Sequence, residues 1–411
     1  MNYTPDEVME YISEEDVKFV RMAFCDIFGR QRNVAIMAGE LPRAFEHGIA
    51  FDASAVAGFE MDVRSDLFLR PDASTLKELP WRPQHGRVAH MFCDVVHPDG
   101  TPCASDLRAL LRRTAEEAAE QGCEFRFGTE MEFYLFKLDE RGEPTKEPFD
   151  RAGYMEVAPE DKGENVRREI CLTLERMGIY PESSHHESGP GQNEIDFRYA
   201  EGVTAADNAI MFRSVVKAIA AQNGLWADFS PRPLPDHDGS GMHINISARR
   251  RGEELSPLKL VPGLLHRIRE MTFFLNPAED SYVRLGRDKA PAFVSWSEQN
   301  RSQLLRLPAA AGQYKRLELR SPDSAANPYL AFSLIIRACL EGIELGMPLP
   351  EAAELDLLRA SREEQKRFET LPVSLAEAVA LAGESDFIRK YVPAPVLAGY
   401  RGNAGQGGSQ R

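Results

Sequence analysis

The segment CEFRFGTEMEFYLF, residues 123–136, alternates hydrophobic and polar residues over most of its length. A period of two residues predicts a β-strand, because successive side chains of a strand point to opposite faces. Glu130 and Glu132 share one face, and Met131 and Phe133 lie on the other. On their own the two glutamates fit a solvated sheet face equally well. The segment therefore predicts a strand with one apolar face and one acidic face.

Three further segments gather side chains of the same kind. SSHHESGPGQNEIDF holds two histidines and two glutamates within ten residues, and its Gly-Pro-Gly turn can fold one glutamate toward the other. In DHDGSGMHINIS a glycine-rich loop precedes a strand whose alternate residues share a face, and RLELRSPD places a glutamate and an arginine on one face. The residues concerned are His185, His186, Glu187, Glu194, His243, Asn245, Ser247, Glu318 and Arg320.

These carboxylates indicate a site for a hard divalent cation. Mg²⁺ and Mn²⁺ take oxygen ligands, and a set of glutamates with one histidine matches that preference without offering the thiolate that zinc often takes. Such metals usually accompany phosphate chemistry, and NRSQLLRLP contributes Arg301 and Arg306, which can neutralise charge on a transferred phosphoryl group. The arginine pair alone is weak evidence, because surface arginines are common.

Composition excludes several classes of protein. A chain of 411 residues, 43% hydrophobic, can bury a large core, and its net charge of −15 disfavours nucleic acid or an anionic membrane as a partner. Six cysteines without a CxxC pair fit neither a zinc motif nor a disulfide framework, and the N-terminus lacks the features of a secretory signal. We therefore expect a soluble, cytoplasmic protein. The apolar stretch 328–347 contains three charged residues, which predicts a buried helix.

The chain divides at HPDGTPCAS, a segment rich in turn-forming residues. The sequence before it, from Val17 to about Val96, has the alternating pattern of β-strands. Asp106 follows it as the predicted start of a helix. We expect a small domain over residues 1–102 and a larger one over residues 103–411. Further helices are predicted at residues 164–177, 205–221 and 258–275, and the glycine-rich tail, residues 400–411, is predicted to be disordered.

Seven motifs occur in an order that resembles the glutamine synthetase family. They are FDASAVAGFE, SDLFLRPD, GTEMEF, HHESGPGQNE, GSGMH, NRSQLLRLP and RLELRSPDSAANPYL, and the resemblance runs from about Val17 to Gly399. Each motif alone is weak, whereas all seven in order are specific. The resemblance implies an α+β fold, in which a small N-terminal β-grasp domain precedes a catalytic domain whose antiparallel sheet is flanked by helices.

The resemblance also implies roles for the matched residues. The implied ligands are Glu132, Glu187 and Glu194 for one metal and Glu130, His243 and Glu318 for another, with Mg²⁺ or Mn²⁺ as the metal and two or more ions in each site. Arg301 and Arg306 match phosphate-binding arginines, with Arg301 also catalytic. The residues implied to bind the glutamate substrate are Asp238, Gly239, Arg284, Arg301 and Arg320, and those implied to bind ATP are Glu182, Asn245, Ser247, Arg301 and Arg306.

The implied reaction joins ammonia to the γ-carboxylate of L-glutamate. Transfer of the ATP γ-phosphoryl group gives γ-glutamyl phosphate, which ammonia attacks to form glutamine with release of ADP and phosphate. Asp52 matches the aspartate that binds ammonium and helps to deprotonate it, contributed by the small domain of a neighbouring subunit. The family assembles in hexameric rings that stack into dodecamers, so we expect a homo-oligomer.

Several positions depart from the family pattern. Ala53 and Ala55 replace a glycine and a serine beside the amine site, and Asp238 replaces an asparagine. The family's flap glutamate corresponds to Lys289, although the segment is one residue shorter and Asp288 is the other candidate for that place. These changes favour an alternative acceptor, namely a polyamine, ethanolamine or a monoamine, in a γ-glutamyl-amine ligase. A catalytically inactive scaffold is a third reading, which the complete set of metal ligands disfavours.

Overall fold

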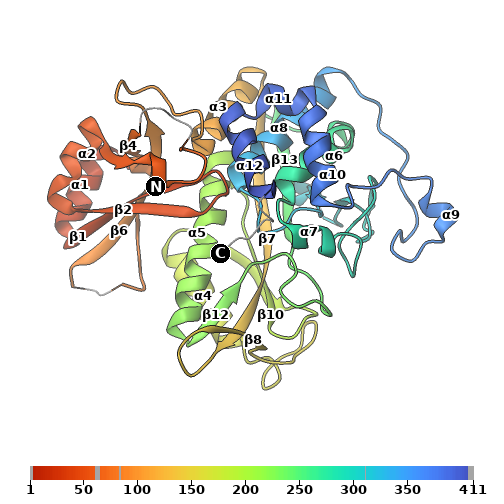
Figure 1. The fold of residues 1–411 in the computed structure, drawn as a ribbon, viewed down its shortest axis with the longest axis horizontal. Coiled ribbons are helices and arrows are strands. Elements are labelled where there is room, and N and C mark those ends of the chain that lie inside the picture. The colour runs from red at the N-terminus through yellow and green to blue at the C-terminus, as the bar shows by residue number, and fades with distance from the viewer. Residues whose placement is uncertain (1–2, 61–64, 83–84, 311, 406–411) are drawn as a thin grey trace.

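The computed structural model describes residues 3–60, 65–82, 85–310 and 312–405. Two sheets organise the chain, a smaller one in its N-terminal part and a larger one in the remainder (Figure 1). The architecture is mixed α+β, as the sequence predicts. Within the described residues, no helix is both long enough and apolar enough to cross a membrane.

The smaller sheet has the strand order β2-β1-β6-β4-β3, with β5 paired to β6. Strands β1 and β6 run parallel and the other pairs are antiparallel. The strands are β1 (Val17–Cys25), β2 (Gln31–Met37), β3 (Ile49–Asp52), β4 (Asp66–Pro71), β5 (Lys77–Glu78) and β6 (Arg87–Val96). The accompanying helices are α1 (Pro5–Glu14) and α2 (Leu41–His47). Helix α2 lies within residues 17–96, which the sequence predicts to be mainly strands. It forms there because Leu41 and Ala44 pack one short apolar face against the core of the small domain.

Strand β7 (Cys123–Leu138) contains the alternating segment 123–136, and it lies inside the larger sheet. The strand order there is β15-β16-β17-β13-β7-β10-β9, and β8, β11 and β12 also pair with β7. The neighbours named are β8 (Pro144–Pro148), β9 (Pro181–His186), β10 (Gln192–Phe197), β11 (Ala200–Glu201), β12 (Leu225–Asp228), β13 (Met242–Arg250), β15 (Trp296–Glu298), β16 (Leu305–Leu307) and β17 (Leu317–Leu319), and β14 (Glu253–Glu254) pairs with β13. Only β15 and β16 run parallel among these pairs.

Helices cover the apolar face of β7. Phe127 stacks on Phe332 of α8 (Pro328–Glu344) with ring centroids 4.3 Å apart, and Phe133 meets Phe212 of α5 (Gly202–Gln222) edge-on at 6.2 Å. Helix α8 is the buried helix that the apolar stretch 328–347 predicts. The remaining helices are α3 (Leu107–Glu120), α4 (Glu164–Arg176), α6 (Val261–Leu275), α7 (Glu279–Arg284), α9 (Arg362–Gln365), α10 (Leu375–Glu384), α11 (Asp386–Tyr391) and α12 (Ala394–Gly405).

The predicted disorder of residues 400–411 is wrong for residues 400–405. Helix α12 continues through Gly405, and Tyr400 is buried, with its hydroxyl donating to the carbonyl of Ile27 at 3.1 Å. The ring of Tyr400 also packs edge-on against Phe273 and Phe274 of α6. These aromatic contacts order the segment despite its glycines. The rest of the tail, residues 406–411, lies outside the described residues.

The two parts of the chain share one apolar core. Ala23, Ile27, Leu79 and Phe92, all from the N-terminal part, belong to the same buried cluster as the residues of the larger sheet and its helices. The opposite face of the small sheet, which carries Val20 and Met22 among others, belongs to a second cluster. The segments on either side of the predicted boundary, residues 1–102 and 103–411, thus pack on each other through this core. The boundary itself stays a prediction.

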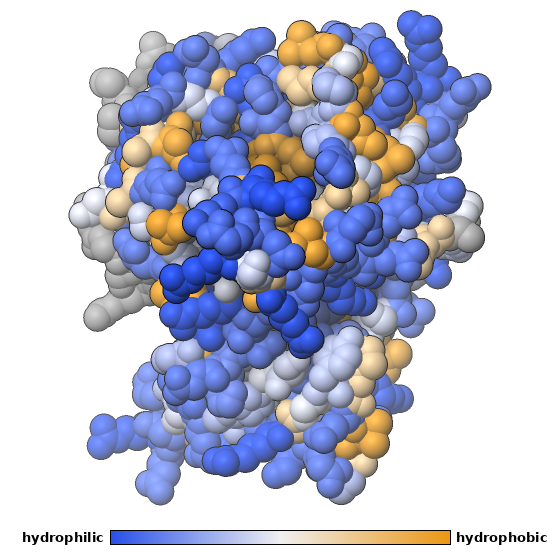
Figure 2. Space-filling model, turned by 90° about the vertical axis from the view of Figure 1, so that its right-hand side faces the viewer, coloured by the Kyte–Doolittle hydropathy of each residue, from blue (hydrophilic) through white to orange (hydrophobic). Residues whose placement is uncertain are grey.

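Hydrophilic side chains cover most of the face that Figure 2 shows, and hydrophobic ones lie among them in separate patches. Large apolar side chains such as Leu345 and Val373 are exposed. Scattered apolar residues of this kind are normal on a protein surface.

Arg108 at the start of α3 joins the two parts through buried ion pairs. Its guanidinium, 5% exposed, lies 2.8 Å from Asp72, 2.9 Å from Asp94 and 2.9 Å from Asp207. Asp207, on α5, also accepts a hydrogen bond from the hydroxyl of Tyr329 at 2.6 Å. Burial opposes its charge, but Asp207 and the other partners hold the pKa of Arg108 well above its usual value.

We predict that Arg108→Gln destabilises the fold by about 3–5 kcal/mol, because it leaves the buried Asp207 without its cation and leaves Asp72 and Asp94 with Arg112 alone. Urea unfolding followed by circular dichroism measures the change. Arg113→Gln on the exposed face of the same helix is the matched control and should change stability little. Equal unfolding midpoints for the two variants would show that the network contributes nothing.

Candidate active site

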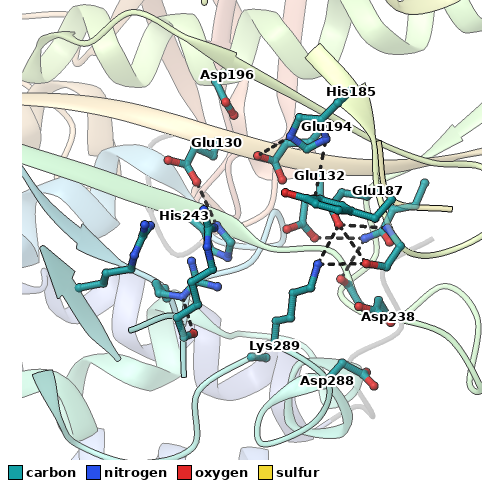
Figure 3. A pocket seen from close by; sticks show the side chains of 18 of the residues that line it. Glu130, Glu132, His185, Glu187, Glu194, Asp196, Asp238, His243, Asp288 and Lys289 are labelled. Atoms are coloured by element: carbon teal, nitrogen blue, oxygen red, sulfur yellow. Dashed lines mark hydrogen bonds and ion pairs between the residues drawn. The ribbon is translucent and has the colours of Figure 1, made fainter. Parts of the chain in front are cut away.

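A pocket of about 740 Å³ opens on the acidic face of the larger sheet. Adjacent strands supply its carboxylates and imidazoles, because the register places Glu132 opposite Glu194 and Glu130 opposite His243. The predicted residues that line it are Glu130, Glu132, Glu187, Glu194, Asp238, Gly239, His243, Arg284, Arg301, Arg306 and Arg320. Figure 3 shows Glu132, Glu187 and Glu194 close together on one side of the pocket and Glu130 with His243 beside them. The pattern of alternate residues on β7 therefore predicts its acidic face correctly.

Glu130, His243 and Glu318 form the first group of possible ligands. One atom of each lies within 4.8 Å of the others, and His243 Nδ1 is 3.2 Å from Glu130 Oε2 and 3.8 Å from Glu318 Oε1. Asn245 donates to Glu130 Oε1 at 2.8 Å. Burial alone raises the pKa of Glu130, but the hydrogen bonds from His243 and Asn245 lower it to about 2. Glu130 is therefore a carboxylate, the form that binds a metal.

Glu187 and Glu194 form a second group together with His185, again with ligand atoms within 4.8 Å. Glu132 faces the same space, where its Oε2 accepts from the Gly241 amide at 2.9 Å and from Gln192 Nε2 at 3.1 Å. Burial and the charge of Glu132 raise the pKa of Glu194 well above its usual value. Such crowding of like charges is the arrangement that a divalent cation relieves.

The Gly-Ser-Gly loop lies where a side chain has no room. A Cβ on Gly239 would meet the carbonyl oxygen of Pro231 at 2.5 Å and Cγ of Arg284 at 2.8 Å, and one on Gly241 would lie 2.9 Å from His243 Nε2. Both glycines therefore allow the loop to pack directly against the arginine and the histidine of the pocket.

Two of the predicted substrate or phosphate arginines contact Glu318. Arg306 donates to Glu318 Oε2 at 2.6 Å and Arg320 to Oε1 at 2.5 Å, and Glu318 has no solvent exposure. Arg284 is buried and donates to the Ser321 carbonyl at 2.8 Å, and burial lowers the pKa of Arg284. Arg301 lines the pocket with its side chain exposed. The pocket thus combines an acidic wall with a cationic one.

Lys289 points into the pocket and Asp288 points away from the carboxylate group (Figure 3). Lys289 Nζ lies 3.4 Å from Glu187 Oε2, 3.0 Å from Ser188 Oγ and 4.4 Å from the centre of the Tyr154 ring. Asp288, with φ +55°, pairs with Arg232 at 3.0 Å. Of the two alternatives for the flap position, the lysine therefore contacts the carboxylates.

The other predicted residues do not line the pocket. Asn245 reaches it only through its hydrogen bond to Glu130, while Glu182 and Ser247 lie on β9 and β13 outside the lining, so their ATP contacts stay predictions. Asp52 ends β3 in the small domain, where it accepts hydrogen bonds from the amide and hydroxyl of Ser54. Its role stays a prediction that requires a neighbouring subunit.

Sequence reasoning missed several lining residues, among them Asp196, Ser183 and Tyr154. The signal for Asp196 was present, because it lies two residues after Glu194 and so on the same strand face. Burial and the charge of Glu130 raise the pKa of Asp196 to about 6. Tyr154 comes from an irregular loop, where no periodicity indicates the direction of a side chain.

Beneath the pocket, His186 joins a buried ionic cluster. Its Nε2 lies 2.8 Å from Asp150 and its Nδ1 2.7 Å from the carbonyl of Glu187, while Arg167 pairs with Asp161 at 2.5 Å. These contacts pair the charges of the group with one another, and the bond from His186 holds the backbone of Glu187 in place.

Comparison with models of known families matches two consecutive parts of the chain. Residues 16–98 match the β-grasp domain of glutamine synthetase and residues 104–406 match its catalytic domain. The chain belongs to the glutamine synthetase family. The N-terminal sheet is thus the β-grasp domain that the sequence predicts.

Individual relatives agree with this family. Over 97% of this chain, the sequence is 41% identical to the glutamine synthetase of Clostridium saccharobutylicum and 42% identical to that of Methanosarcina mazei, covering 93% and 92% of those proteins. Among solved structures, GmaS in complex with ADP superposes with a TM-score of 0.88 at 27% identity, covering 100% of this chain and 97% of that one. The Plasmodium falciparum glutamine synthetase superposes with a TM-score of 0.83 at 21% identity over 98% of this chain and 96% of that one, which shows the shared fold.

We predict that Lys289→Met increases the affinity of the protein for Mn²⁺ several-fold. The ammonium beside Glu187 repels a second cation and occupies one of its possible ligands. Isothermal titration calorimetry measures the effect. Arg287→Met is the matched control, because Arg287 lines the same pocket with the same charge and its guanidinium makes no hydrogen bond or ion pair within the described residues. Equal affinities for the two variants would contradict the prediction.

Proposed function

We propose that this protein is an ATP-dependent ligase that joins ammonia to the γ-carboxylate of L-glutamate. The observation that carries the proposal is the pairing of two carboxylate groups with the four arginines Arg284, Arg301, Arg306 and Arg320 in one pocket of a glutamine synthetase fold. The carboxylates suit hard cations, and the arginines suit the carboxylate and phosphate groups of the substrates.

The donor set fits Mg²⁺ or Mn²⁺, because both groups offer carboxylate oxygens and imidazole nitrogen and neither offers a thiolate. We assign Glu130, His243 and Glu318 to one ion and Glu132, Glu187 and Glu194 to another. Bound there, such ions would neutralise phosphate charge and orient ATP toward glutamate. The raised pKa of Glu194 and the crowding around it support this assignment.

We assign the first step to the cationic wall of the pocket. Arg301 and Arg306 stabilise the charge that develops on the γ-phosphoryl group as it moves to the glutamate carboxylate. Arg306 now donates to Glu318, so binding of phosphate there requires it to exchange one anionic partner for another. The product of the step is γ-glutamyl phosphate, whose phosphate is a good leaving group.

Recognition of the two substrates is assigned to the surrounding loops and strands. Arg284, Arg320, Asp238 and Gly239 border the place of the glutamate substrate. Burial and the charge of Asp288 raise the pKa of Asp238. The proposed contacts to ATP are Glu182, Asn245, Ser247, Arg301 and Arg306.

The second step requires an amine that has lost its proton. We propose that Asp52 of a neighbouring subunit accepts this proton. Hydrogen bonds from Ser54 lower the pKa of Asp52, so it is ionised and suited to hold ammonium. The segment that carries Lys289 lies over the carboxylates and limits the access of water to the acyl phosphate. Amide formation then releases phosphate.

An organic amine is the second candidate acceptor. The observation that favours it is the ammonium of Lys289, which lies beside Glu187 and over the Tyr154 ring and so repels free ammonium. Phosphate release from ATP with Mg²⁺ and glutamate distinguishes the acceptors when ammonium, ethylamine, ethanolamine and putrescine are compared. Turnover with ammonium supports glutamine synthesis, whereas turnover only with organic amines supports a γ-glutamyl-amine ligase.

We propose that the protein works as a homo-oligomeric ring in the reducing cytoplasm, as a hexamer or as two stacked hexamers. Asp52 lies outside the pocket of its own chain, which supports a site completed by a neighbour. All six cysteines are free thiols, which fits a reducing compartment.

We predict that Glu130→Gln lowers phosphate release with glutamate and ammonium by about 10²-fold or more, because a neutral amide is a weaker ligand for a hard cation. Glu124→Gln is the matched control. It lies on the same face of β7 but is exposed and outside the pocket, so its rate should stay unchanged. A Glu130→Gln enzyme with full activity would remove this residue from the metal site.

We predict that Asp52→Asn lowers amine-dependent turnover but leaves the affinity for Mn²⁺ unchanged. When Asp52→Asn and Glu130→Gln subunits are dissociated, mixed equally and reassembled, some sites should combine an intact Glu130 with an intact neighbouring Asp52. Random assembly restores about a quarter of the activity. No recovery in mixed rings of confirmed size would refute the contribution of Asp52 from a neighbour.

A further inference from the structure

A second polar pocket lies between the small sheet and helix α5, apart from the carboxylate pocket. Its volume is about 250 Å³, and its polar lining consists of Arg21, Gln31, Asn33, Arg82, His90 and Ser214. None of its lining residues is an aspartate or a glutamate. This is unusual in a chain with 64 acidic and 49 basic residues. The proposed ligase reaction uses none of these side chains.

The strand register brings the polar residues together. Arg21 of β1 pairs with His90 of β6, and Asn33 of β2 pairs with Ala23 of β1. Ala23 belongs to the core shared with the larger sheet, so this sheet face is directed toward that part of the chain. Helix α5 supplies Ser214 on the other side. The pocket therefore has walls from both parts of the chain.

A hydrogen-bond chain fixes the proton on His90. The hydroxyl of Ser214 donates to Gln31 Oε1 at 2.8 Å, and Gln31 Nε2 lies 3.0 Å from His90 Nε2. Because an amide nitrogen only donates, His90 Nε2 accepts, and the ring proton is on Nδ1. Burial, followed by the charges of Lys77 and Arg21, lowers the pKa of His90 to about 3, so the ring is neutral.

The remaining nitrogen of His90 has no partner on another residue within the part of the chain that the structure describes. His90 is 1% exposed, and Nδ1 faces only the backbone of His90 itself, without the geometry of a full hydrogen bond. A buried donor without an acceptor is rare and costs about 1–3 kcal/mol. An acceptor that enters the pocket would remove this cost.

Arg21 and Arg82 add two charges that lack partners. Neither guanidinium makes a hydrogen bond or an ion pair within residues 3–60, 65–82, 85–310 and 312–405. Burial and then the charge of Arg82 lower the pKa of Arg21, so the two cations repel each other across the pocket. Arg21 is half-buried and Arg82 is exposed at the mouth of the pocket, whereas buried arginines such as Arg108 and Arg167 face carboxylates.

We propose that this pocket binds a small dianion between the guanidinium groups of Arg21 and Arg82, with His90 Nδ1 as an additional donor. Two guanidinium groups match a phosphate or a short dicarboxylate, because each presents paired N–H donors to two oxygens. The ligand would contact the sheet of the small domain and lie against α5. Its binding therefore stabilises the contact between the two parts of the chain.

Calorimetric titration of the full-length protein tests the proposal with inorganic phosphate, succinate and glutarate, at constant ionic strength with chloride as the background anion. We expect saturable binding of at least one dianion and weaker binding of acetate. Arg21→Gln and Arg82→Gln should each weaken it about tenfold or more, since each removes a charge-assisted interaction. Comparison of the phosphate and dicarboxylate titrations identifies which chemistry the pocket prefers.

Controls separate this pocket from the arginines of the carboxylate pocket. Arg301→Gln, which alters only the carboxylate pocket, and the exposed-face variant Arg113→Gln should keep the binding that Arg21→Gln and Arg82→Gln lose. The ligand should also raise the midpoint of thermal unfolding in the unchanged protein and in Arg301→Gln but not in Arg82→Gln. The proposal is overturned if no dianion binds, or if binding is lost in Arg301→Gln and kept in both Arg21→Gln and Arg82→Gln.

Both variants are expected to fold, because neither guanidinium makes a hydrogen bond or an ion pair to the described residues that its replacement would break. Circular dichroism and the unfolding midpoint without ligand check this. If one variant fails to fold, the other still decides the outcome, since the proposal requires both charges.

Discussion

The pairing of β7 with β13 on one side and β10 on the other determines most of what this chain can do. Its register sets Glu130 opposite His243 and Glu132 opposite Glu194, so groups more than sixty residues apart in the sequence meet across two strand spacings. A slip of one residue would turn these carboxylates into the apolar layer of α5 and α8 and bring Met131 and Phe133 to the pocket. The stacking of Phe127 on Phe332 opposes such a slip, so the apolar side of the strand fixes the chemistry of its acidic side.

The acidic face is stable only because cations oppose it. Arg306 and Arg320 hold Glu318, and Lys289 approaches Glu187, so the protein supplies positive charge from its own side chains. The structure therefore describes a site with internal counter-ions, which metals and substrates replace during the proposed reaction. The same side chains serve in both states, which explains how a pocket with so many carboxylates keeps a defined shape.

Local patterns in the sequence predicted the parts of the fold that depend on local physics. The alternation in residues 123–136 identified the two faces of β7, and the apolar stretch 328–347 identified α8. Asp106 was predicted to start a helix, and its side chain caps the first turn of α3. The ordered end at Tyr400 and the direction of Lys289 depend on contacts between distant segments. No spacing along the chain records such contacts. Family resemblance supplied the roles of Glu318 and Arg301, which periodicity alone left open.

The shared core and the Arg108 network have a consequence for how the protein unfolds. Ala23, Ile27 and Phe92 are part of the small domain by topology, yet they complete the apolar cluster of the larger one, and Arg108 bonds to carboxylates of both. Removing either part would expose apolar surface and leave buried charges without partners. The two domains therefore form one cooperative folding unit, and an excised domain of either kind would lack part of its own interior.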